Sequence, residues 1–230
     1  MKLITLDWEG TMVDFQWDLT GAVAETTALL QAKNIPASFA GLDYAGIYNL
    51  VQEKSLQWGF GDGSLLALID ALYDRYDLDA ASRWHACEGL EETLKALKGC
   101  KLALVSNVGR KAIDRMLNEF GLSGSFGLVL TRNDMPRLKP DPWGIQKAMT
   151  WAGACPDETM HIGDSLSDLF AARRARVKIG IVMGGQDTAE TLLQEKPDLL
   201  LEKLMHLPDK IQEPRSKMQE TRNKMQEARE

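Results

Sequence analysis

Two carboxylates, Asp7 and Glu9, are the first residues in this 230-residue chain whose types and spacing could do chemistry. They follow Lys2–Leu6, a short apolar run that predicts a buried strand. Residues two apart in an extended chain face the same side, so both carboxylates should project from the strand's carboxyl end, where ligands of open α/β sheets gather. Trp8 should point to the opposite face and pack, and Gly10 releases the chain into a turn. The alternative is an acidic loop without a chemical role.

A second pair of carboxylates, Asp164 and Asp168, follows the apolar run Met160–Ile162. Asp168 comes four residues after Asp164 and so shares its face in the opening turn of a helix. Near Asp7 these carboxylates would repel one another without a cation, and oxygen ligands alone favour a hard ion such as Mg²⁺. The alternative for Asp168 is a helix-start acid that complements the helix dipole.

Two further segments carry groups that suit an anion. Ser106 and Asn107 end the apolar run Lys101–Val105 just before a helix, where hydroxyl, amide and free N–H groups suit an oxyanion. The same pair is also ordinary turn chemistry. Lys139 lies between a predicted strand and a helix that can begin at Pro142, which would hold it in place. The alternative interpretation of Lys139 is an ordinary exposed surface lysine.

The elements that must position these side chains alternate between strands and helices. Apolar runs that predict buried strands are Lys2–Leu6, Lys101–Val105, Leu128–Leu130, Met160–Ile162, Ile179–Val182 and Leu199–Leu201. Helical periodicity lies between them, over Leu90–Leu97, Lys111–Phe120, Pro142–Trp151, Leu166–Arg174 and Thr188–Gln194. The alternation predicts an α/β fold, a Rossmann-like doubly wound parallel sheet with helices on both faces.

Two parts of the chain depart from this alternation. From about residue 15 to about residue 84 there is helical periodicity and no convincing strand, which predicts a helical insertion after the first strand. Residues 214–230 carry a charged seven-residue repeat with one methionine in each copy, Met218 and Met225. The repeat has no a/d seam and predicts a tail helix that either frays or binds a partner.

Composition excludes several classes of protein. The net charge is −6, from 27 basic and 33 acidic residues, which argues against a general nucleic-acid-binding surface. No segment approaches the roughly 18 apolar residues of a membrane span, and Asp7 interrupts any signal-peptide core. The three cysteines include no CxxC pair, which argues against a disulfide framework and a structural zinc site. We expect a reduced, cytoplasmic protein without nucleic-acid or membrane partners.

The four chemistry-bearing segments occur in an order that resembles the four motifs of the haloacid dehalogenase superfamily. These are the strand end from Asp7 to Thr11, the strand ending in Ser106-Asn107, Lys139-Pro140, and Gly163-Asp164 with Asp168. The resemblance covers about residues 1–207 and is closest to the helical-capped, phosphoglycolate phosphatase-like branch. It implies a core domain of residues 1–14 and 87–213, with strand order 5-4-1-2-3, and a helical cap domain of residues 15–86.

The resemblance also implies catalytic roles for the motif residues. Asp7 would be the nucleophile that forms an aspartyl-phosphate. Glu9 would be the general acid/base, protonating the leaving alcohol and later activating water. Ser106 and Asn107 would bind phosphoryl oxygens, while Lys139 would neutralise them and restrain Asp7.

The same resemblance implies a magnesium site. Asp7 and Asp164 would bind Mg²⁺, and Glu9 would contribute its backbone carbonyl. Asp168 would be a further ligand or would support the others. A divalent ion and a lysine are needed because a phosphate dianion cannot otherwise approach several carboxylates.

One residue departs from the family's phosphatase pattern, which has aspartate where this chain has Glu9. The extra methylene could displace the transferred proton by about 1 Å, and a displacement of that size can cost on the order of a hundredfold in rate. We predict a Mg²⁺-dependent phosphatase acting on a small phosphorylated metabolite, as a monomer or a homodimer. The alternatives are a dehalogenase-type hydrolase in which Asp7 attacks carbon, a sugar-phosphate mutase, and a catalytically silent binding module, which Glu9 supports best.

Five residues outside the motifs bear on the substrate. Arg110 and Lys111 follow the second motif and could meet a substrate carboxylate or a second phosphate, or could face solvent. The insertion is unusually rich in tryptophan, with Trp17, Trp58 and Trp84. These residues are more typical of its core than of a substrate clamp.

Overall fold

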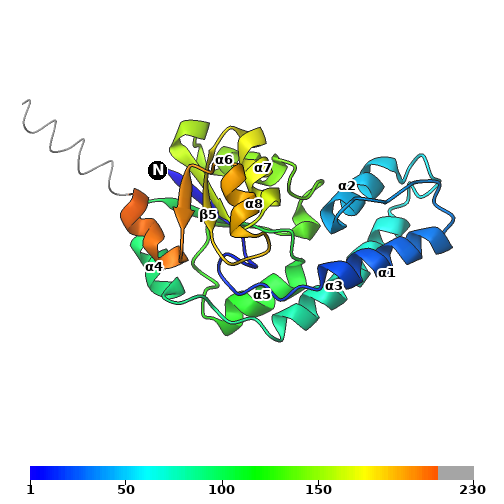
Figure 1. Ribbon diagram of the computed structural model, residues 1–230, viewed down its shortest axis with the longest axis horizontal. Coiled ribbons are helices and arrows are strands. Elements are labelled where there is room, and N and C mark those ends of the chain that lie inside the picture. Colours follow the sequence, from blue (N-terminus) through cyan, green and yellow to red (C-terminus); the bar gives the residue numbers. More distant parts are fainter. Residues whose placement is uncertain (212–230) are drawn as a thin grey trace, which may run out of the picture.

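A computed structural model describes residues 1–211, which contain one six-stranded parallel sheet (Figure 1). The strands are β1 (Leu3–Leu6), β2 (Lys101–Val105), β3 (Leu128–Leu130), β4 (Thr159–Gly163), β5 (Lys178–Val182) and β6 (Leu199–Leu201). Their order is β3-β2-β1-β4-β5-β6. Counted from the opposite edge, the predicted order 5-4-1-2-3 is the order of the first five strands, and β6 pairs beyond β5. The predicted fold class is confirmed.

Strand β1 lies at the centre of the sheet, and all four of its residues are buried. Its last residue, Leu6, pairs with Leu104 of β2 on one side and with Ile162 of β4 on the other. This register brings the carboxyl ends of three strands to one edge. The segments that begin at Asp7, Ser106 and Asp164 therefore leave the sheet side by side.

Helices cover both faces of the sheet. They are α4 (Leu90–Ala96), α5 (Arg110–Glu119), α6 (Trp143–Ala152), α7 (Leu166–Ala175) and α8 (Ala189–Gln194), with short 3₁₀ turns η1 (Arg132–Asp134), η2 (Pro156–Glu158) and η3 (Leu204–His206). One buried cluster includes apolar residues of α4 and α5, and a second lies between β5 and helices α6, α7 and α8. Burial of these apolar faces against the sheet is the main force that holds the layers together.

Between β1 and α4 the described chain forms three helices and no strand, as the periodicity predicted. They are α1 (Leu19–Ala32), α2 (Tyr44–Lys54) and α3 (Ser64–Ala81), which gather to one side of the sheet in Figure 1. Asp18 and Asp43 cap α1 and α2 by accepting hydrogen bonds from the backbone N–H groups of Gly21 and Gly46. We call residues 15–86 the helical insertion. Its status as a separate cap domain stays a prediction.

The predicted tail helix of residues 214–230 lies outside the described residues. Within residues 1–211, no helix combines the length and the apolar character that a membrane crossing requires.

Candidate active site

Lys139 occupies the centre of a buried charge cluster at the carboxyl edge of the sheet. Its Nζ lies 2.8 Å from Oδ1 of Asp7 and 2.5 Å from Oδ1 of Asp168, and its side chain is only 3% exposed. The backbone of Lys139 is fixed as well, because its N–H donates to Oδ1 of Asn107 at 2.9 Å and its carbonyl accepts from Nδ2 at 3.1 Å. Asp7 and Asp168 thus meet at the ammonium group of Lys139, while Asn107 of the second motif holds its backbone.

Three carboxylates, those of Asp7, Asp164 and Asp168, each offer an oxygen within 4.8 Å of the others. Burial raises the pKa of Asp7, and the charge of Asp168 adds to that effect against the attraction of Lys139. Burial, followed by repulsion from Asp168 and Asp7, raises the pKa of Asp164 well above its ordinary value. A cation would relieve this repulsion, and an all-oxygen set of ligands fits a hard divalent ion.

The backbone around Asp164 leaves room for its carboxylate only because two neighbouring residues are glycines. A Cβ on Gly10 or on Gly185 would come within 2.1 Å of Oδ2 of Asp164. Gly10 also has a φ of +78°, in the left-handed region that favours glycine. The carboxylate is held there by Thr11, whose hydroxyl donates to Oδ1 at 2.9 Å, and by the N–H of Gln186, which donates to Oδ2 at 2.7 Å.

Asp168 differs from the other two carboxylates because its oxygens already have close partners. Oδ1 contacts Lys139 and, at 3.0 Å, Nε2 of His161, while Oδ2 accepts from the Ser165 hydroxyl at 2.6 Å. Burial alone would raise the pKa of Asp168, but the charge of Lys139 and the contact with His161 hold it well below its ordinary value. These contacts favour a supporting role for Asp168, orienting Lys139, over direct metal ligation.

Glu9 lines the same pocket as Asp7, as its spacing predicted. Its Oε1 accepts hydrogen bonds from the N–H of Gln16 at 2.7 Å and from Nε1 of Trp84 at 2.8 Å. Burial raises the pKa of Glu9 to about 7, although these hydrogen bonds act in the opposite direction. A carboxyl group with such a pKa is suited to give and take a proton near neutral pH.

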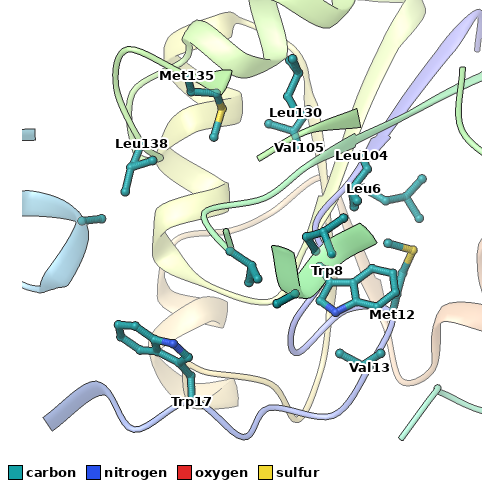
Figure 2. Close-up of a cluster of buried hydrophobic side chains, with 14 of the residues drawn as sticks. Leu6, Trp8, Met12, Val13, Trp17, Leu104, Val105, Leu130, Met135 and Leu138 are labelled. Carbon is teal, nitrogen blue, oxygen red and sulfur yellow. The ribbon is translucent and has the colours of Figure 1, made fainter. Parts of the chain in front are cut away.

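Trp8 points to the opposite face, as predicted. It is fully buried, stacks on Phe120 with ring centroids 6.3 Å apart, and meets Trp84 edge-on at 6.1 Å. Figure 2 shows its indole among Leu6, Met12 and Val13, away from the indole of Trp17. The packing of Trp8 therefore fixes the backbone between the two carboxylates.

Ser106 and Asn107, the predicted phosphate-binding pair, line the pocket beside Asp7. The loop that carries them is anchored to the helical insertion, because the N–H of Gly109 donates to Oδ2 of Asp77 on α3 at 2.9 Å. Asp77 was not a sequence candidate. A lone aspartate on a helix gives no sign that it meets a loop 32 residues away.

Several other residues that line the pocket or fix its groups were not predicted to do so from sequence. Trp84 was assigned to the core of the insertion, and it is buried, but its N–H holds Glu9. Tyr44 and Ser167 line the pocket, and Trp17, also assigned to the core, lines it too. Among the described residues three buried side-chain polar atoms lack a hydrogen-bond partner: the hydroxyl of Ser167, Nε1 of Trp17 and, in the core, Nε1 of Trp8. The place of Trp84 at the end of the predicted insertion is the signal that could have drawn attention to it.

Arg110 and Lys111, for which a substrate contact and solvent were both open, do not line the pocket. Arg110 pairs with Asp114 and Asp134, and Lys111 pairs with Asp74 at 2.9 Å while remaining 72% exposed. Both cations are directed to carboxylates of the protein.

Comparison with solved structures places the fold among known hydrolases. A Haemophilus somnus protein described as a predicted phosphoglycolate phosphatase superposes with a TM-score of 0.63 at 24% identity, covering 92% of this chain and 98% of that one. A hydrolase from Pseudomonas syringae gives 0.67 at 22% identity, covering 93% and 99%. At these identities the likeness shows the fold alone.

Sequence comparison adds relatives of known class. Phosphoglycolate phosphatase 1 of Pseudomonas aeruginosa is 28% identical over 225 residues, covering 88% of this chain and 77% of the relative. The pyrophosphatase PpaX of Halalkalibacterium halodurans is 34% identical over 123 residues, covering 49% of this chain and 57% of the relative. A family model for haloacid dehalogenase-like hydrolases matches residues 6–182. These matches confirm the predicted superfamily and the predicted class of enzyme, a phosphatase. The chain belongs to the haloacid dehalogenase-like hydrolase family.

Proposed function

We propose that the protein is a Mg²⁺-dependent phosphatase that hydrolyses a small phosphomonoester through an aspartyl-phosphate on Asp7. The observation that carries the proposal is the surroundings of Asp7. Asp7 directly follows the central strand, and its carboxylate lies 2.8 Å from Nζ of Lys139. It lines the same pocket as Glu9 and the Ser106-Asn107 pair. A nucleophile, an acid/base group and phosphate-binding donors are thereby gathered within reach of one substrate.

In the first step a carboxylate oxygen of Asp7 attacks phosphorus, and the bond from phosphorus to the alcohol oxygen breaks. The leaving alcohol takes the proton carried by Glu9. In the second step a water molecule attacks phosphorus and gives a proton to Glu9, and the bond from phosphorus to the Asp7 oxygen breaks. Inorganic phosphate leaves, and both carboxyl groups return to their starting states.

The negative charge of the transferred group is balanced by groups aimed at its oxygens. Lys139 is held in place by Asp168 at 2.5 Å, and Asn107 fixes the lysine backbone. Preorganised charges of this kind need little reorganisation during the reaction and act strongly where water is excluded. Asp168 is thus a positioning residue in this proposal.

Mg²⁺ fits the carboxylates present, and Asp7, Asp164 and the backbone carbonyl of Glu9 would hold it. When bound, it offsets the charge of the phosphate and of the carboxylates. Asp164 is oriented for this role by Thr11 and by the N–H of Gln186.

A panel of small phosphomonoesters, assayed for phosphate release with and without Mg²⁺, tests the proposal. We expect release that depends on Mg²⁺ and that is abolished in Asp7→Asn. The matched control is Asp157→Asn, which makes the same substitution at an exposed aspartate of η2 and should keep full activity.

Other results would point to the alternatives. Activity on haloacids that persists in excess chelator would favour a dehalogenase, and transfer of the phosphoryl group to a second sugar phosphate would favour a mutase. Absence of turnover on every substrate would favour a binding module.

A further inference from the structure

The helical insertion lines the pocket of Asp7 with side chains that carry no positive charge. They are Phe15, Trp17 and Leu19 at its start, Tyr44 at the beginning of α2, and the acidic Asp77 on α3. The free space that remains is about 30 Å³, which accommodates about two or three water molecules. A group bonded to the phosphate therefore touches these walls directly, without a layer of water between.

The only cationic side chain that lines the pocket, within residues 1–211, is Lys139. Its Nζ already contacts two carboxylates, Asp7 and Asp168, and it faces the phosphate position. The other charged side chains of the lining, Glu9 and Asp77, are acidic. A second anionic group on the substrate would thus lie near acidic side chains and aromatic rings, and no cation of the lining would be available to pair with it.

Arg132 is the buried cation next to this wall, and it is fully engaged. It is 1% exposed, and three of its nitrogens contact three carboxylates of α3: Asp70 at 2.9 Å, Asp74 at 2.5 Å and Asp77 at 2.6 Å. Releasing it toward a substrate would leave those carboxylates without their partner, which is costly in a buried position.

Two aromatic side chains of this wall carry a polar atom, Tyr44 and Trp17. The Tyr44 hydroxyl lies within hydrogen-bonding reach of the Asn107 side chain. The Trp17 side chain is 7% exposed, and its Nε1 is buried without a hydrogen-bond partner among the described residues. A buried N–H that lacks an acceptor is unfavourable, so it suits a ligand that brings one. An N–H donor carries no net charge, so it can pair with a neutral oxygen but cannot replace the cation that a buried carboxylate needs.

Resting on the proposed phosphatase function, we propose that the leaving group is compact and uncharged, and that its oxygen accepts a hydrogen bond from Nε1 of Trp17. Trp17 is then a specificity-determining residue. A leaving group that carries a carboxylate, such as glycolate, is disfavoured because the wall offers it no cation. This preference separates the chain from relatives named for phosphoglycolate.

Four phosphomonoesters test the proposal by their kcat/KM values at saturating Mg²⁺. They are 2-hydroxyethyl phosphate, propyl phosphate (which replaces the terminal hydroxyl with a methyl group), 2-phosphoglycolate and p-nitrophenyl phosphate. We expect 2-hydroxyethyl phosphate to exceed propyl phosphate by about tenfold, the cost of leaving one buried donor unpaired. It should exceed 2-phosphoglycolate by at least about a hundredfold, because like charges would be brought together.

Two variants assign these preferences to residues. Trp17→Phe keeps a ring but removes the N–H, and should bring the ratio of 2-hydroxyethyl to propyl phosphate close to one. Trp151→Phe makes the same substitution at a tryptophan of α6 that is 37% exposed and lies outside the pocket, and should leave the ratio unchanged. Leu19→Arg adds a cation to the wall and should raise the relative kcat/KM for 2-phosphoglycolate at least about tenfold.

The outcomes separate the two proposals. No phosphate release from any of the four substrates would overturn the proposed function and this inference with it. Release in which 2-phosphoglycolate matches or exceeds 2-hydroxyethyl phosphate would overturn this inference alone. The melting temperature of each variant identifies any variant that does not fold. In that case the kcat/KM values of the wild-type protein on the four substrates decide whether the inference holds.

Discussion

The indole N–H of Trp84 donates a hydrogen bond to Oε1 of Glu9 at 2.8 Å, across 75 residues of sequence. Trp84 lies near the end of the helical insertion, and Glu9 lies at the end of the central strand. The insertion therefore fixes the group that we propose as the acid/base. The orientation of Glu9 depends on how the insertion packs against the core.

Trp84→Phe tests this dependence. The variant keeps an aromatic ring in the buried site but removes the donor, so Glu9 loses one of the two hydrogen bonds to Oε1. We expect kcat on an alkyl phosphate to fall by about tenfold, because small misplacements of a catalytic group are costly. The loss should be smaller on p-nitrophenyl phosphate, whose leaving group needs little protonation. An equal loss on both substrates would indicate a merely structural role.

Glu9→Gln removes the proposed acid/base while keeping the shape of the side chain. Turnover of an alkyl phosphate should fall by roughly 10²–10⁴-fold, the usual contribution of such a group. Steady-state phosphate release with matched amounts of folded protein measures it. A variant as fast as wild type on an alkyl phosphate would refute the acid/base role.

Glu9→Asp restores the family's usual residue, yet we expect a modest loss of activity. The shorter side chain would draw the carboxylate away from Trp84 and from the N–H of Gln16, both of which contact Oε1. The kcat of this variant on the same alkyl phosphate checks the expectation. A gain would mean that the longer side chain is a defect rather than an adaptation.

Arg132→Met should destabilise the fold by about 3 kcal/mol or more, because the buried carboxylate of Asp77 would lose its counter-charge. Urea unfolding followed by circular dichroism measures the change. Arg115→Met is the matched control, since Arg115 pairs with Glu119 on the exposed face of α5 and should contribute less than about 1 kcal/mol. Equal effects of the two variants would contradict the account of the Arg132 cluster.

Mg²⁺ should raise the melting temperature of the wild-type protein, because a ligand that binds only the native state stabilises it. Asp164→Asn should lose most of that shift. The substitution removes a proposed metal ligand, a buried carboxylate that neighbouring carboxylates repel unless a cation is bound. Differential scanning fluorimetry with and without Mg²⁺ gives both values. A variant that keeps the full shift would place the metal elsewhere.

The sheet could be predicted from sequence because each strand is a short apolar run with a helix on either side. The predicted run Ile179–Val182 became Lys178–Val182, and Met160–Ile162 became Thr159–Gly163. That Asp7, Ser106 and Asp164 would lie close together could be predicted because each follows a strand, and parallel strands end at one edge. Lys139 lies beyond β3 and the turn η1, so strand order alone does not place it there, and the roles of these residues stay predictions. Local sequence thus contains most of the information on the core.

Contacts between the insertion and the core could not be predicted in this way. Arg132 meets Asp70, Asp74 and Asp77 only after α3 has folded against the turn η1. Three acidic residues on one helix give no sign of which distant cation they will contact. The hydrogen bond from Trp84 to Glu9 was hidden for a related reason. A tryptophan in an apolar context is typical of a core, and only tertiary structure shows what its N–H faces.

The most direct test of the central claim is the covalent state of Asp7 during turnover. Glu9→Gln should still form the aspartyl-phosphate from p-nitrophenyl phosphate, because that leaving group departs without a proton, but the attack by water should be slow. Acid-quenched enzyme analysed by mass spectrometry should then carry one phosphoryl group, on the peptide that contains Asp7. Finding no phosphoryl group there, together with an Asp7→Asn variant that turns over like wild type, would contradict the account.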